Sequence, residues 1–274
     1  MPIEFYIRID WTENAMESDT MIFMEFQRKL EPMVNDIEKA IRDELRENSI
    51  FKSKTITSAW DFLNPKSKAV ERLVYAYQVG RDIAANILTP IDKREDMLAA
   101  GDSVKRTVLL YGRYGTGKTL SALRIASYAN ERGWTFLLVR PGDSITAALQ
   151  FAKLFQPAVV FFEDVESATK ADEGRSLAIN EVLNTLDGLM GKDDQIICLL
   201  TTNHPDQISS GMLRPGRIDF MIDMNRQDED SIVELVLTYG TGMISDEEDF
   251  RAAKSDIASA AEGYTPAFVV GGIQ

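Results

Sequence analysis

The strongest constraint on the fold is a series of short apolar runs, most of them separated by stretches with helical character. The runs are Thr107–Tyr111, Trp134–Val139, Ala158–Phe162, Ile196–Leu200 and the weaker Phe220–Met224. Short buried strands that alternate with helices indicate a parallel sheet covered on both faces. We therefore predict an α/β fold with a parallel five-stranded sheet flanked by helices. Ligands of such sheets bind beyond the carboxyl ends of the strands, so the residues directly after each run are the candidate site.

The region 1–92 lacks this alternation, and we predict a separate N-terminal region of α+β type. Apolar and polar residues alternate over Ile3–Ile9, which predicts a short half-buried strand. Apolar residues recur every three or four positions over Thr20–Asn48, which predicts an amphipathic helix with a break at Pro32. A further helix is predicted over Lys66–Leu88.

Composition excludes several classes of protein. Of 274 residues, 45% are hydrophobic and 27% charged, which is typical of a folded globular chain and excludes a disordered or collagen-like one. The net charge of −13 disfavours nucleic acid and anionic membrane as partners, and no apolar run approaches the roughly 18–20 residues that span a bilayer. One cysteine, Cys198, and one histidine, His204, exclude an intrachain disulfide and disfavour structural zinc. We expect a reducing compartment, most simply the cytoplasm, and an inert buried Cys198 thiol.

The segment Gly112–Thr119, which follows the first run, reads GRYGTGKT. It fits the phosphate-loop pattern G-x-x-x-x-G-K-[ST] and lies between a predicted strand and a predicted helix, as the motif requires. Glycines let backbone N–H groups close around phosphates, Lys118 can reach the β- and γ-phosphate oxygens, and Thr119 can hold Mg²⁺. The alternative is a glycine-rich turn with a solvated lysine.

Two carboxylates, Glu163 and Asp164, end the third run. Beside a phosphate loop this pair suits metal-assisted hydrolysis, in which one carboxylate holds Mg²⁺ and the other orients or deprotonates the attacking water. An acidic helix cap or a solvated loop is the alternative.

Polar residues also follow the fourth run. Asn203 could bind the attacking water, or it could open the turn before Pro205. Beyond it, Arg214 and Arg217 flank a Pro-Gly turn. They could form local surface ion pairs or reach the γ-phosphate of a neighbouring subunit as arginine fingers.

Together these residues resemble the AAA ATPases over roughly residues 93–274. The matching segments are Gly112–Thr119 (Walker A), Val159–Asp164 (Walker B), Leu186–Gly188, Thr201–Pro205 (sensor 1), Leu213–Asp219 (arginine-finger region) and Glu262–Ala267 in the helical lid. The resemblance implies a P-loop nucleotide-binding domain over 93–225 and a partial helical lid over 226–274.

The resemblance also implies roles for individual residues, with ATP and Mg²⁺ as cofactors. The implied ATP-binding residues are Gly112, Gly115, Thr116, Gly117, Lys118, Thr119, Leu120, Gly263 and Ala267. The implied catalytic residues are Glu163, Asp164, Asn203, Arg214 and Arg217. Thr119 and Glu163 would hold Mg²⁺, partly through water.

Three features depart from the common family pattern. Arg113-Tyr114 replaces Pro-Pro, and the acids run Glu163-Asp164 where Asp-Glu is usual, so that by position Glu163 serves the metal and Asp164 the water. The chain after Val139 is short and lacks an aromatic-glycine segment, so we expect no aromatic grip on a client from the turn 140–145. The Glu163-Asp164 order and the short segment after Val139, together with Thr201–His204, are similar to the branch that translocates a folded Rieske iron–sulfur protein across the mitochondrial inner membrane. That branch carries a transmembrane helix that this chain lacks, so its substrate and location are not transferred.

The function implied by the resemblance is a chaperone-like ATP hydrolase that assembles as a hexameric or heptameric ring and remodels or translocates a protein client. One alternative is an ATP-dependent nucleic-acid machine, such as a clamp-loader or helicase relative, against which the net charge counts. Another is a nucleotide-binding assembly scaffold with little turnover. Stimulation by DNA would identify the first alternative, and measured turnover would exclude the second.

Overall fold

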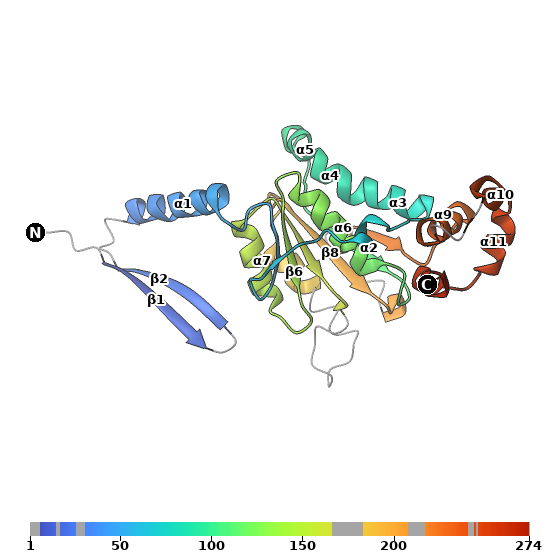
Figure 1. Ribbon diagram of the computed structural model, residues 1–274. Coiled ribbons are helices and arrows are strands. Elements are labelled where there is room, and N and C mark those ends of the chain that lie inside the picture. Colours follow the sequence, from blue (N-terminus) through green and yellow to red (C-terminus); the bar gives the residue numbers. More distant parts are fainter. Residues whose placement is uncertain are drawn as a thin grey trace, which may run out of the picture. The chain divides into compact units, whose positions relative to one another are not determined.

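The computed structural model describes residues 6–14, 17–25, 31–165, 183–207, 217–240, 244 and 246–273 (Figure 1). The chain divides into two compact units, Met1–Asn48 and Ser49–Gln274. All residues predicted for the functional site belong to the second unit. The division after Asn48 differs from the boundary at residue 92 that the sequence suggested.

The first unit holds a β-hairpin and a helix. Strands β1 (Tyr6–Asn14) and β2 (Glu17–Glu25) pair in antiparallel fashion, and helix α1 spans Glu31–Asn48. The predicted early strand is confirmed from Tyr6 onward, and its first residues lie outside the described part of the chain. The predicted helix begins later than expected because its first residues form β2. Pro32 does not break α1, because it lies in the first turn, where a backbone N–H has no intrahelical acceptor.

The second unit is built on one sheet, in which the described strands follow the order β4-β3-β6-β7-β8-β5-β9. Their bounds are β3 (Thr55–Thr57), β4 (Phe62–Leu63), β5 (Arg106–Tyr111), β6 (Thr135–Val139), β7 (Ala158–Phe162), β8 (Ile196–Thr202) and β9 (Phe220–Asp223). All neighbouring pairs are parallel except β3 with β4. The α/β fold and the five predicted parallel strands are confirmed. The prediction missed the short strands β3 and β4, which extend the sheet beyond β6.

Strand order decides which loops meet. Strand β5 pairs with β8, and β8 pairs with β7, so the carboxyl ends of these three strands are adjacent. The phosphate loop, the acidic pair and Asn203 follow these three ends. The topology therefore gathers the three predicted parts of the site at one edge.

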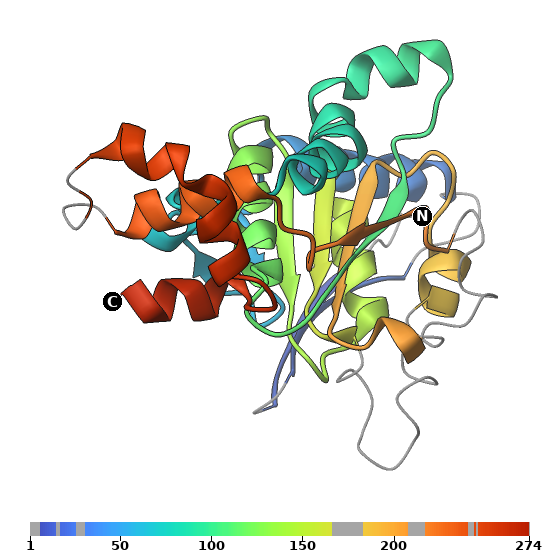
Figure 2. The ribbon, with the colours of Figure 1, turned by 90° about the vertical axis from the view of Figure 1, so that its right-hand side faces the viewer.

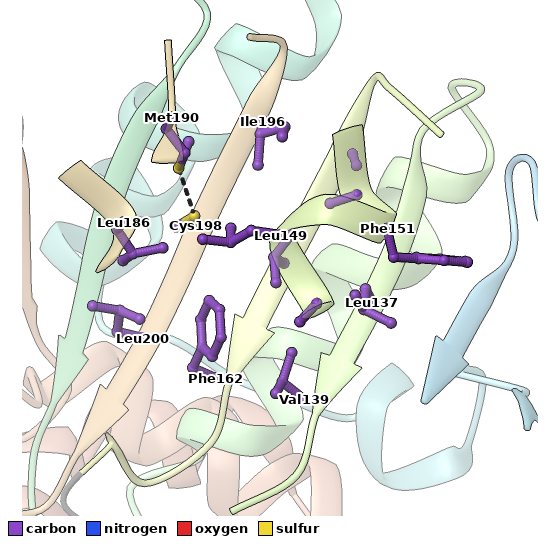
Figure 3. Close-up of a cluster of buried hydrophobic side chains, with 14 of the residues drawn as sticks. Leu137, Val139, Leu149, Phe151, Phe162, Leu186, Met190, Ile196, Cys198 and Leu200 are labelled. Carbon is purple, nitrogen blue, oxygen red and sulfur yellow. Dashed lines mark hydrogen bonds between the residues drawn. The ribbon is translucent and has the colours of Figure 1, made fainter. Parts of the chain in front are cut away.

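Apolar side chains on the two faces of the sheet form two buried clusters. On one face, helix α7 (Ile145–Leu154) packs with residues such as Leu137 and Phe162, while Leu186 and Met190 lie beside Leu200 and the buried Cys198 (Figure 3). On the other face, helix α6 (Lys118–Asn130) and the helices before β5 cover the second cluster. Strand β7 is buried along its whole length, as expected of a central strand covered on both faces.

The expected single helix over Lys66–Leu88 is wrong. The structure has instead the helices α2 (Lys68–Glu71), α3 (Tyr77–Ile83), the π-helical turn η2 (Ala84–Leu88), α4 (Thr89–Asp92) and α5 (Arg94–Ala100). Residues 73–76 between α2 and α3 are not helical. This interruption has a functional consequence, because it brings Leu73 and Val74 beside the phosphate loop.

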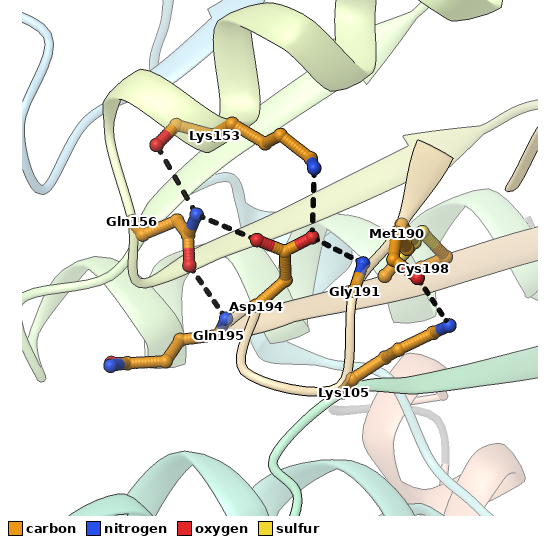
Figure 4. A network of polar contacts seen from close by, with 8 residues as sticks. All are labelled: Lys105, Lys153, Gln156, Met190, Gly191, Asp194, Gln195 and Cys198. Atoms are coloured by element: carbon orange, nitrogen blue, oxygen red, sulfur yellow. Dashed lines mark hydrogen bonds and ion pairs between the residues drawn. The ribbon is translucent and has the colours of Figure 1, made fainter. Parts of the chain in front are cut away.

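The sheet edge opposite the site is fixed by a polar network around Asp194 (Figure 4). One carboxylate oxygen of Asp194 pairs with the Lys153 ammonium at 3.0 Å and accepts the Gly191 N–H at 2.7 Å. The side-chain amide of Gln156 donates to the other oxygen at 3.3 Å, and its carbonyl accepts the Gln195 N–H at 2.6 Å. The network joins the end of α7 to the start of β8 and holds the register of β7 and β8.

The C-terminal part is helical, as predicted for a lid. It contains α9 (Glu229–Tyr239), α10 (Glu247–Ala252), α11 (Lys254–Ala260) and α12 (Pro266–Ile273), which gather at one side of the sheet (Figure 2). Among the described helices, none is long and apolar enough to cross a membrane.

Candidate functional site

The segment Gly112–Thr119 joins β5 directly to α6. Gly115 and Gly117 have φ angles of +80° and +90°, which residues with a Cβ adopt only under strain. Helix α6 begins at Lys118, so its unpaired N–H groups and positive dipole end face the loop. The segment has the strand–loop–helix context that a phosphate-binding loop requires.

The Lys118 ammonium lies inside this loop and its residue is only 7% exposed. It donates to the carbonyl oxygens of Gly112 at 2.8 Å and Arg113 at 3.1 Å. A third bond reaches Oδ1 of Asn203 at 2.6 Å. These acceptors hold the ammonium inside the loop, at a position where phosphate oxygens could replace them as hydrogen-bond partners.

The two adjacent acids have different surroundings. The hydroxyl of Thr119 donates to Oε1 of Glu163 at 2.6 Å. In contrast, Oδ1 of Asp164 accepts the side-chain amide of Asn203 at 3.0 Å, and the Asp164 N–H donates to the Thr201 hydroxyl at 2.9 Å. Asp164 adopts a φ of +44°, uncommon for a residue with a side chain, which turns it away from the strand direction of β7.

The donor set fits Mg²⁺. A hydroxyl and a carboxylate, from Thr119 and Glu163, are hard oxygen donors within reach of one another. The described residues contain no group of three or more histidine, cysteine or acidic side chains placed to hold a metal. A magnesium ion here would therefore take its other ligands from water and phosphate, which is its usual mode in nucleotide sites.

A cavity of about 540 Å³ opens beside the phosphate loop, within the usual range for small-molecule sites. Tyr114–Leu120, Asp164 and Asn203 line one side of it. The other sides are lined by Ala69, Arg72, Leu73 and Val74, which lie between β4 and β5 in the chain, and by Leu235, Tyr239, Pro266, Ala267, Val270 and Gly271 of the lid. The sequence analysis missed most of these outer residues. The sequence predicted one continuous helix over 66–88. It therefore did not predict the non-helical residues that place Leu73 and Val74 in the cavity wall.

The lid touches the loop directly. The Ala267 N–H donates to the Gly115 carbonyl at 3.1 Å, and a Cβ on Gly115 would come within 2.8 Å of the Ala267 Cβ. Ala267 therefore lies where the prediction placed it, in the cavity wall. Gly263 does not line the cavity, and its carbonyl accepts the Arg113 guanidinium at 3.4 Å.

Asp228 anchors the lid to the rest of the unit. Its side chain caps α9 through the Ser231 N–H at 2.7 Å and accepts the Tyr77 N–H of α3 at 2.6 Å. Burial raises the pKa of this carboxyl, but the hydrogen bonds from Ser231 and Tyr77 outweigh burial and leave the pKa below its ordinary value.

The predicted arginines are only partly described. Arg214 lies outside the described residues. The Arg217 guanidinium lies 3.8 Å from the carboxylate of Asp187 and does not line the cavity of its own chain. Its predicted action on a neighbouring subunit stays a prediction.

The turn after β6 is tied to the β3–β4 turn. The Ser58 hydroxyl accepts the Arg140 N–H at 3.2 Å and donates to the Asp143 carboxylate. Trp60 on the same turn is 43% exposed and packs edge-on against Phe151 with ring centroids 4.4 Å apart. The segment 140–143 contains no aromatic residue, but the β3–β4 turn to which it is bonded presents the exposed aromatic side chain of Trp60.

Cys198 is confirmed as a buried thiol. It is fully buried, its pKa is raised by burial, and its Sγ lies 3.4 Å from the Met190 Sδ. A thiol that resists ionisation in an apolar cluster is a packing group.

Comparison with known proteins gives the family of the segment that carries the loop. Residues 108–226 match the "ATPase family associated with various cellular activities (AAA)". They form an AAA ATPase domain. The AAA domain contains Lys118, the acidic pair and Asn203, whereas 72–74 and the lid residues that complete the cavity lie outside the matched range.

Several known proteins are similar to this chain over more than half of its length. The chain is 31% identical over 209 residues to the 26S proteasome regulatory subunit S10B homolog B of Arabidopsis thaliana, which covers 68% of this chain and 50% of that protein. It is 30% identical over 200 residues to the ATPase family gene 2 protein of Saccharomyces cerevisiae, covering 67% of this chain and 25% of that protein. It is also 30% identical over 170 residues to the Peroxisomal ATPase PEX6 of Kluyveromyces lactis, covering 55% and 17%. The chain thus spans half or less of the length of these relatives.

Proposed function

We propose that this chain is an ATP hydrolase that assembles as a ring and uses ATP binding and hydrolysis to remodel or translocate a protein client. The observation that carries the proposal is the hydrogen-bonded series Lys118–Asn203–Asp164, which begins in the phosphate loop and ends at a carboxylate in the cavity wall. A phosphate cation, a polar amide and a candidate base are thereby aligned along one wall.

In the proposed mechanism Lys118 moves from the carbonyls of Gly112 and Arg113 to the β- and γ-phosphate oxygens. Mg²⁺ bound by Thr119 and Glu163 would supply further positive charge to those oxygens. Asn203 and Asp164 hold the attacking water, and Asp164 takes its proton.

The base and the ribose of the nucleotide would be held between the phosphate loop, the lid and the segment 72–74. The cavity wall beyond the phosphates is largely apolar, with Leu73, Val74, Leu235 and Val270, and suits a base and a ribose.

The proposed ring assembly is supported by the need for positive charge around the γ-phosphate during hydrolysis. Among the described residues of the phosphate loop and of the adjoining strand ends, Lys118 is the cation in the cavity wall, while Arg217 pairs with Asp187 outside the cavity. Arg214 and Arg217 of a neighbouring subunit, in a hexamer or heptamer, would supply the compensation of an arginine finger. The named relatives, among them a proteasome subunit and a peroxisomal ATPase, favour a protein client over nucleic acid.

The finer resemblance to the Rieske-protein translocase branch rests on Glu163-Asp164, Thr201–His204 and the short 140–145 turn. None of the relatives named above carries that activity in its name, so the client stays open. A cytoplasmic location is also part of the proposal, and it is supported by the single cysteine, Cys198, of this sequence.

The deciding experiment is an ATPase assay on size-fractionated protein, with Lys118→Ala as the inactive reference. We expect turnover in the oligomeric fraction and little in the monomer. Binding of ATP without turnover in any fraction would favour the scaffold alternative. Stimulation by DNA but by no protein would favour the nucleic-acid machine.

A further inference from the structure

Arg113 occupies a junction between the phosphate loop and the lid. Its N–H donates to Oδ1 of Asn225 at 2.8 Å. Asn225 follows β9, and both its backbone N–H and its side-chain amide donate to Asp223 at 3.0 Å. Asn225 is therefore oriented from two sides to accept the N–H of Arg113, and it stands where the chain leaves the sheet for α9.

One peptide group joins Asn225 to the loop lysine. The Arg113 N–H and the Gly112 carbonyl belong to the same planar peptide unit. The Gly112 carbonyl accepts Lys118 at 2.8 Å, while the N–H of the same plane, which points in the opposite direction, is bonded to Asn225. Because hydrogen bonds in a series polarise one another, a change at Lys118 alters the bond to Asn225.

The Arg113 side chain adds a second link. Its guanidinium reaches the Gly263 carbonyl at 3.4 Å, three residues before α12 begins. The same region of the lid touches the loop again where the Ala267 N–H binds the Gly115 carbonyl. Arg113 thus contacts the lid through its side chain, and through its backbone it contacts Asn225, which lies between β9 and α9.

We infer that Arg113 and Asn225 are positioning residues that couple occupation of the phosphate loop to the docking of α12. The inference rests on the proposed function, because phosphate must draw Lys118 away from the Gly112 carbonyl. Proline, common at position 113 in the family this chain resembles, has no N–H and could not make the Asn225 bond.

Amide hydrogen exchange at Ala267 reads the docking directly, because this N–H binds the loop. Inorganic tripolyphosphate with Mg²⁺ is the probe, since it occupies the loop without filling the space between Leu73 and Val270. In the wild-type chain we expect the probe to slow exchange at Ala267 at least about twofold. A typical hydrogen bond contributes about 0.5–1.5 kcal/mol, so Asn225→Ala and Arg113→Ala should each exchange about 2- to 10-fold faster without ligand. In both variants the response to tripolyphosphate should be lost.

Gln227→Ala is the matched control. Gln227 also binds the lid backbone, through the Tyr264 carbonyl at 3.2 Å, but makes no bond to the loop. Its removal should speed exchange while the probe still slows it by the wild-type factor. Arg113→Lys, which keeps a cation for Gly263, should recover part of the response.

Kinetics supply a second readout. In Asn225→Ala we expect the KM for ATP to stay within about twofold of wild type and kcat to fall about 3- to 10-fold. This is the size of effect expected when one hydrogen bond that acts after ATP has bound is lost. An undiminished probe response in both Asn225→Ala and Arg113→Ala, or a loss of response equally large in Gln227→Ala, would overturn the inference. Absence of any tripolyphosphate and ATP binding by the wild-type chain would instead overturn the proposed function.

Discussion

The ammonium of Lys118 donates to Oδ1 of Asn203 at 2.6 Å, across 85 residues of sequence. The amide nitrogen of the same asparagine donates to Asp164 at 3.0 Å. Each of the two polar atoms of Asn203 therefore has its own partner, which fixes the orientation of the amide. The loop lysine and the candidate base are held at a defined separation before any nucleotide arrives.

Removal of the ammonium should abolish tight ATP binding. We expect Lys118→Ala to weaken binding by roughly 10- to 100-fold or more, since hydrogen bonds to charged groups are worth about 1.5–3 kcal/mol each. Fluorescent-nucleotide titration measures the loss. Lys93→Ala, which removes an exposed lysine paired with Asp96, is the control and should bind normally. Near-normal affinity in Lys118→Ala would refute the phosphate-loop assignment.

Substitution of Glu163 and substitution of Asp164 should impair different steps of ATP hydrolysis. Asp164→Asn should bind ATP and hydrolyse it at least about tenfold more slowly, because a general base contributes typically 10²–10⁴-fold. Glu163→Gln should raise the Mg²⁺ concentration needed for activity, because Glu163 contacts Thr119. Magnesium titrations of both variants distinguish the roles. If Glu163→Gln binds ATP and Mg²⁺ normally but is inactive while Asp164→Asn turns over, the two roles are reversed.

Sequence periodicity predicted the parallel sheet because its strands are short, apolar and buried on both faces, as β7 shows. The same reasoning failed between Lys66 and Leu88. The apolar spacing there continues through Leu73–Ala76, yet these residues leave the helix to pack beside the loop, where tertiary contacts override periodicity. Strands β3 and β4 were missed because two or three residues are too few to show alternation.

Motif spacing placed Lys118, Glu163, Asp164 and Asn203 correctly at one sheet edge, since their positions follow from strand order. It could not foresee the bond of Arg113 to Asn225, because 112 residues separate the partners and neither belongs to a motif that requires the other. The absence of aromatic residues in the 140–145 turn was read from the sequence, but the exposed Trp60 beside that turn depends on tertiary folding.

Asp228 should stabilise the lid in a pH-dependent way. Its pKa is lowered in the folded chain, so its stabilisation is fully present above the ordinary carboxyl pKa and is lost as the pH falls through the lowered value. Asp228→Asn should therefore differ from wild type by a constant free energy of unfolding above about pH 5, with the difference shrinking below about pH 4. Denaturant titrations at several pH values measure this.

A comparison of two helix caps sharpens that test. Loss of an N-cap costs about 1 kcal/mol. Asp246 caps α10 through the N–H groups of Glu248 and Asp249, and its side chain bonds to no other element in the described part of the chain. Asp228→Ala should destabilise more than Asp246→Ala, because it also loses the Tyr77 N–H. Equal costs would show that the bond to α3 contributes nothing.

Arg217 should act on a neighbouring subunit. Within its own chain it pairs with Asp187 at 3.8 Å and stays outside the cavity. Arg217→Ala and Arg214→Ala should leave ATP binding nearly intact while hydrolysis falls steeply, since an arginine finger is worth roughly 10³–10⁵ in rate. Asp187→Ala is the local control, because it removes the intrachain partner and leaves the guanidinium available.

Mixing of variants decides between local and neighbouring action. Arg217→Ala chains lack the finger but keep the phosphate loop, and Lys118→Ala chains lack the loop lysine but keep the finger. A mixed ring contains sites in which an intact loop faces an intact finger, so activity should partly return on mixing. A mixture that co-assembles, as shown by differently tagged chains, yet remains as inactive as its parts would refute action on the neighbour. Full hydrolysis by a dilute wild-type monomer would remove the requirement for a ring altogether.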